Sequence, residues 1–81
     1  MPTISESVSR LVRDRLAIDV DKFPSGDRRD GLRWLIEHLG MQLKAGDENG
    51  CLFTIRRIDE IIRKFKSEKQ TDLFVESINH A

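Results

Sequence analysis

Apolar side chains recur at helical spacing in three stretches of the chain. In the first stretch, residues 4 to 18, they fall on one face: Ile4, Val8, Leu11, Val12 and Leu16. A period of three and four residues predicts an amphipathic helix. Thr3 and Glu6 stand at the spacing of a capping box, in which each side chain satisfies a free backbone amide. We therefore expect a helix over residues 4 to 18.

The second stripe follows a loop. The segment "DVDKFPSGD", residues 19 to 27, contains proline, serine and glycine in sequence, which favour a turn over a helix. A second helix is expected from Asp27 or Asp30 to Leu43. Its apolar positions are Leu32, Leu35, Ile36, Leu39 and Leu43. Glycine is unfavourable inside a helix, so Gly40 marks either an early helix end or a close contact.

The third stripe predicts a helix over residues 54 to 66, with Thr54 as its N-cap. Its buried face would comprise Ile55, Ile58, Ile61, Ile62 and Phe65. The preceding segment "KAGDENG", residues 44 to 50, reads as a loop with an Asn-Gly turn. A strand at "CLFTI" fits local propensity but has no obvious pairing partner.

The pattern weakens at "SEKQ", residues 67 to 70, after which a short last helix is expected over residues 71 to 78. The chain is thus predicted to be all-α: a small bundle of three main helices plus a short terminal helix. We expect one domain over residues 1 to 81, with a core from about residue 4 to residue 66 and a C-terminal extension at 67 to 81.

Composition narrows the function classes. The 14 basic and 14 acidic residues cancel, which argues against nucleic acid as a partner because nucleic-acid binders usually carry a net positive field. No apolar run is long enough to span a membrane, and the first ten residues lack the pattern of a secretion signal. A lone cysteine, Cys51, cannot close an intramolecular disulfide, so a cytoplasmic setting is expected.

Catalytic and metal-binding constellations are not apparent in the sequence. His38, His80 and Cys51 do not stand at metal-ligand spacing. Cys51 is interpreted as a small buried apolar group and His38 as a residue on a helix surface. We expect neither an enzyme nor a metal site.

Three segments together resemble the acyl and peptidyl carrier protein family. "LIEHLGMQLKAGD", residues 35 to 47, is similar to the end of the second carrier helix and the turn after it. "FTIRRIDEIIRKF", residues 53 to 65, is similar to the threonine-capped last helix. "LVRDRLAIDVDKF", residues 11 to 23, is similar to the first helix and the start of the long loop. The resemblance implies a carrier-like fold that meets partner enzymes of fatty acid, polyketide or nonribosomal peptide biosynthesis.

In carriers the serine of an Asp-Ser-Leu motif receives a phosphopantetheine arm. Here Asp30 and Leu32 match the flanks, but Gly31 has no side chain to esterify. The nearest hydroxyl is Ser25, whose neighbours Pro24 and Gly26 differ from the motif. The resemblance therefore implies either a domain without the arm or one in which Ser25 holds phosphopantetheine. A turn or N-cap role for Ser25 is the simpler interpretation.

The start of the second helix is basic, whereas this region of carriers is usually acidic. Arg28, Arg29 and Arg33 are therefore candidate partner-binding residues, and their partners should differ from those of ordinary carriers. The first loop and the distance between Leu32 and Gly40 are also shorter than in the family.

Two other functions remain open. "LIEHLGMQL" resembles the first helix and turn of a helix-turn-helix regulator, but the next segment, "KAGDENGCL", is acidic and rich in glycine. A plain docking or inhibitor module is the other hypothesis. Trp34 and Met41 lie off the apolar stripe, where they could anchor a partner. Packing of these two residues under the first loop or the last helix is the interpretation we favour from sequence.

Overall fold

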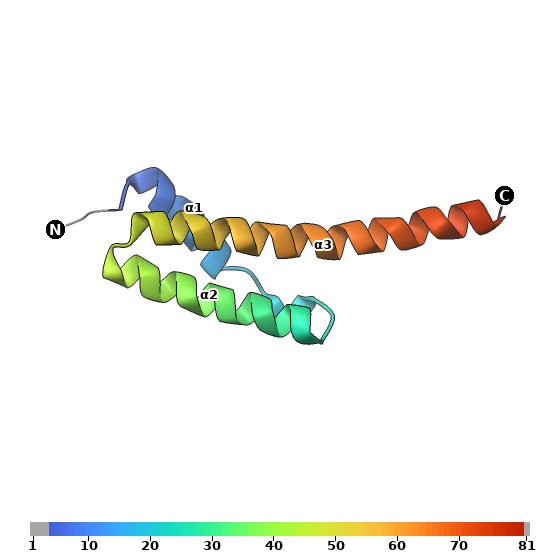
Figure 1. Ribbon diagram of the computed structural model, residues 1–81, viewed down its shortest axis with the longest axis horizontal. Coiled ribbons are helices and arrows are strands. Elements are labelled where there is room, and N and C mark those ends of the chain that lie inside the picture. Colours follow the sequence, from blue (N-terminus) through green and yellow to red (C-terminus); the bar gives the residue numbers. More distant parts are fainter. Residues whose placement is uncertain (1–3, 81) are drawn as a thin grey trace.

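A computed structural model places three α-helices and one 3-10 turn along the chain (Figure 1). It describes the backbone of residues 4–80 and the side chains of residues 4–67. The elements are α1 (Glu6–Leu16), η1 (Val20–Lys22), α2 (Asp27–Ala45) and α3 (Glu48–His80). The molecule is 83% helical, and the described residues contain no strand. The predicted all-α bundle is confirmed, and "CLFTI" lies inside α3.

Helix α1 is capped by Ser5, because the Ser5 hydroxyl accepts the amide of Val8 at 3.4 Å. The predicted cap at Thr3 lies outside the described residues. The Ser5 hydroxyl also donates to the Glu48 carboxylate at 2.7 Å, and the Ser5 amide donates to the same oxygen at 3.2 Å. The start of α1 is thereby fastened to the first residue of α3.

Helix α2 runs through Gly40 and ends at Ala45, so the expected early end there is wrong. The predicted close contact is only ordinary packing, since an added Cβ would lie 3.7 Å from the Leu16 side chain. The helix stops at Gly46, whose φ of 72° is the left-handed conformation that favours glycine. Only two residues then separate α2 from α3, which makes the two helices an antiparallel hairpin (Figure 1).

Helix α3 begins at Glu48, six residues before the predicted start at Thr54. Asp47 takes the capping role, because its carboxylate accepts the Gly50 amide at 3.0 Å. The predicted loop at residues 44–50 is therefore mostly helical. The helix also continues to His80 without a break, so the separate terminal helix at 71–78 is wrong. "SEKQ" contains neither glycine nor proline, and loss of an apolar stripe does not by itself end a helix.

The core lies where the three helices meet. Its buried side chains come from all of them: Val8, Val12, Leu32, Leu39, Cys51, Ile55 and Ile58. A bidentate ion pair at 2.9 and 3.2 Å joins Arg15 of α1 to Asp59 of α3. At the other end of the hairpin, the rings of Phe23 and Phe65 lie 4.8 Å apart. α1 covers one face of the hairpin, and no element within residues 4–80 covers the opposite face.

The hairpin register is set by a buried polar contact. The Thr54 hydroxyl of α3 donates to the Gln42 side-chain carbonyl of α2 at 2.6 Å. Away from this contact, α3 is much longer than α2 and continues past it as a single helix (Figure 1). The molecule therefore measures 60 × 22 × 16 Å. Among the described residues, no helix combines the length and apolar character needed to cross a bilayer.

Candidate functional site

The uncovered side of the α2–α3 hairpin carries the largest exposed apolar side chains of the described residues. We call it the outer hairpin face and define it by two rows at helical spacing. The row on α2 is Trp34, His38 and Met41, and the row on α3 is Phe53, Arg57 and Ile61. Both rows point away from α1, since the buried positions of each helix lie on its opposite side. One continuous surface is thus formed by two helices.

Aromatic side chains on this face are open to solvent. Trp34 is 61% exposed, Phe53 65% and Met41 67%. The Trp34 indole stacks on the His38 ring, with centroids 5.1 Å apart and planes 7° from parallel. The Arg57 guanidinium lies 6.0 Å from the centre of the Phe53 ring. These contacts orient the two aromatic rings without burying them. The favoured interpretation, that Trp34 and Met41 pack under the first loop or the last helix, is therefore wrong.

A shallow groove of about 390 Å³ lies between α2 and α3 on this side of the hairpin, beside Trp34 and Arg57. Gly31, Trp34 and Leu35 line it from α2, and Arg57, Ile61 and Lys64 line it from α3, together with Glu60. Gly31 has nothing within 4 Å of the position of a Cβ, so it leaves this part of the groove open. The floor is apolar and the rim charged, which is the pattern of a protein-docking surface.

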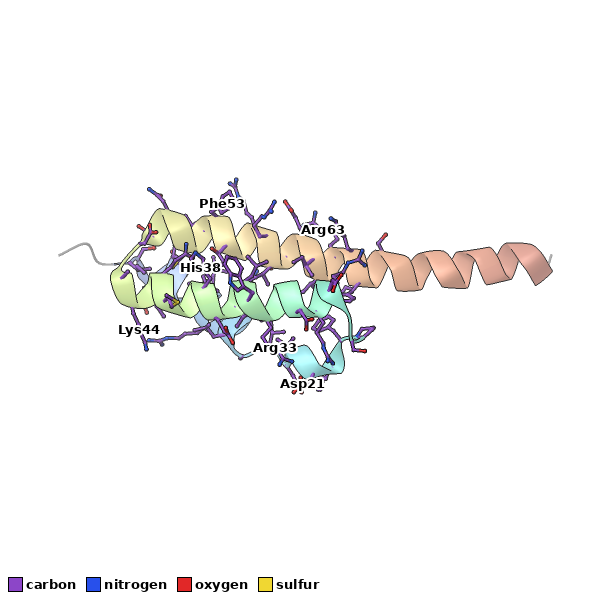
Figure 2. The ribbon with its side chains drawn as sticks, turned by 60° about the horizontal axis from the view of Figure 1, so that its bottom comes forward. Asp21, Arg33, His38, Lys44, Phe53 and Arg63 are labelled. Atoms are coloured by element: carbon purple, nitrogen blue, oxygen red, sulfur yellow. The ribbon has the colours of Figure 1, made fainter. Side chains whose placement is uncertain are left out.

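The three arginines predicted to bind a partner make contacts within the domain: Arg29 and Arg33 contact the first loop, and Arg28 contacts α3. Arg33 forms an ion pair with Asp21 at 2.8 Å, and the two side chains approach one another in Figure 2. Arg29 donates to the Phe23 carbonyl at 3.4 Å. The Arg28 guanidinium lies 5.5 Å from the centre of the Phe65 ring. These contacts fasten residues 21–23 against α2 and α3, so the arginines have a structural role here.

Ser25 lies exposed in the loop between η1 and α2. Two residues later α2 begins, after Gly26 with a φ of 144°. Residues 30 to 32, which the sequence resemblance placed at the carrier motif, lie inside the first turns of α2. The candidate attachment site and the outer hairpin face are therefore separate parts of the molecule.

The hairpin geometry also bears on the helix-turn-helix hypothesis. In that motif two helices cross at a steep angle, and the second is the recognition helix. Here α2 and α3 run antiparallel, and "KAGDENGCL" comprises the connection and the start of α3. The predicted recognition segment is thus not a separate helix.

Cys51 lies in the core and His38 lies on the outer hairpin face. Burial raises the pKa of the Cys51 thiol, with smaller contributions from the Asp47 and Glu48 carboxylates. The thiol is fully buried, as the sequence suggested, and it packs in the core. His38 stacks on Trp34. Within the described residues, no group of three histidine, cysteine or acidic side chains is placed to hold a metal ion.

Phe53 and Arg57 are the site residues that sequence reasoning missed. With α3 expected to begin at Thr54, Phe53 belonged to the helix entry and had no assigned face. Extending the helix back to Glu48 puts Phe53 opposite the buried positions Cys51 and Ile55. Phe53 would have been assigned to this face if the helix had been predicted to start at Glu48.

Comparisons with family models, with curated proteins and with solved structures gave no match, and none identifies a carrier protein-like family.

Proposed function

We propose that this protein is a non-catalytic interaction domain that docks a protein partner on its outer hairpin face. The observation that carries the proposal is the joint exposure of Trp34, Met41 and Phe53 on one side of the hairpin. Tryptophan, phenylalanine and methionine are enriched at the centres of protein interfaces. Truncation of an interface tryptophan often costs more binding energy than that of most other residues.

The surroundings of these residues also support a protein partner. The groove is shallow, and charged side chains of both signs lie beside it. A small molecule is usually buried in a concave site, whereas a protein can cover a shallow apolar strip and leave the charged rim wet. We place this activity in the cytoplasm, a setting that suits a chain with one cysteine.

Site-specific photo-crosslinking in the native cells tests the proposal. A photo-reactive phenylalanine derivative replaces Met41 or Phe53, two positions that tolerate bulk because they face solvent. The matched control carries the same derivative at the position of Asp14, an exposed residue on α1. We expect discrete adducts at positions 41 and 53 and none at position 14. Equal yields at all three positions would mean that this face has no special contact.

A second candidate function follows from the position of Ser25. It is an exposed hydroxyl just before a long helix, the place that the modified serine has in the carrier proteins this chain resembles. As a carrier, the domain would present a phosphopantetheine thiol to enzymes of fatty acid, polyketide or nonribosomal peptide biosynthesis. Incubation with coenzyme A and a promiscuous phosphopantetheinyl transferase should then add about 340 Da. The gain should be absent in Ser25→Ala, and no gain in the unaltered chain would exclude this candidate.

A further inference from the structure

We draw no further inference here: the strongest candidate, the exposed apolar side chains of the outer hairpin face with the shallow groove beside them, carries nothing beyond the proposed function because nothing in the described residues shows what covers that face.

Discussion

The buried contact between Thr54 and Gln42 makes a sharp test of the hairpin register. Thr54 is 2% exposed, and its hydroxyl donates to the half-buried Gln42 side chain. Gln42→Ala leaves that hydroxyl buried without its acceptor, which should cost about 2 kcal/mol. Thr54→Val keeps the shape and frees a Gln42 carbonyl that can reach water, so its cost should be about 0.5 kcal/mol.

The sign of the Thr54→Val effect should depend on the residue at position 42. In the unaltered chain the valine lowers the free energy of unfolding. In Gln42→Ala it should raise that free energy, because it removes the unsatisfied hydroxyl. Urea unfolding followed by circular dichroism measures all four members of the cycle. A loss of about 2 kcal/mol corresponds to roughly 10 °C in Tm for a domain of this size.

A specific competing effect would refute this reasoning. A threonine hydroxyl inside a helix can bond the carbonyl four residues earlier. If Thr54 turns to its own helix when Gln42 is removed, Gln42→Ala should cost no more than Thr54→Val and the sign reversal should disappear. Lys44→Ala, an exposed change on the same helix, serves as the control and should stay within about 0.5 kcal/mol.

Two further predictions concern the glycines and the cysteine. Gly40→Ala should stabilise the fold by about 0.5 to 1 kcal/mol in thermal unfolding, since its Cβ meets Leu16 at an ordinary 3.7 Å. Gly50→Ala should lack that gain, because its Cβ would displace the Asp47 carboxylate that caps α3. The raised pKa of Cys51 implies that the contribution of this thiol to stability is constant below the unfolded thiol pKa of about 8.5 and falls as the pH rises above it. The chain has no tyrosine to titrate in this range, so Cys51→Ala should flatten the urea-unfolding profile between about pH 8 and 10; an equal slope in that variant would contradict the assignment.

Sequence periodicity located all three main helices because burial enforces it. Val8, Val12, Leu32, Leu39 and Ile58 were assigned to apolar stripes and are core residues in the structure. The helix boundaries were predicted less well from the sequence. Gly46 ends α2 and Asp47 caps α3, so only two residues connect the helices. The composition of "KAGDENG" had suggested a longer loop. Which of several polar residues acts as a cap depends on tertiary contacts, and Ser5 shows this by bonding Glu48.

The candidate site was only partly predictable. Trp34 and Met41 were singled out because they leave the stripe, but spacing alone does not say whether another element covers them. That depends on the length and path of α1, which packs on the other side of the hairpin. The basic residues Arg29 and Arg33 were assigned to a partner, yet the first loop provides a backbone carbonyl and Asp21 for them. A charged residue on a helix surface can contact either a partner or a neighbouring loop, and the sequence alone does not show where the loop lies.

The distribution of aromatic residues supports the outer hairpin face as the candidate functional site. Four aromatic side chains belong to the described part, and two of them, Phe23 and Phe65, pack on each other. The other two, Trp34 and Phe53, remain more than 60% exposed. Burying an aromatic side chain of this size contributes roughly 2 kcal/mol, and a domain near the lower size limit has little other core to draw on. Half of its described aromatic residues therefore contribute little to folding in the single chain. A partner that covers Trp34 and Phe53, as the proposed function requires, would recover a stabilisation that the single chain lacks.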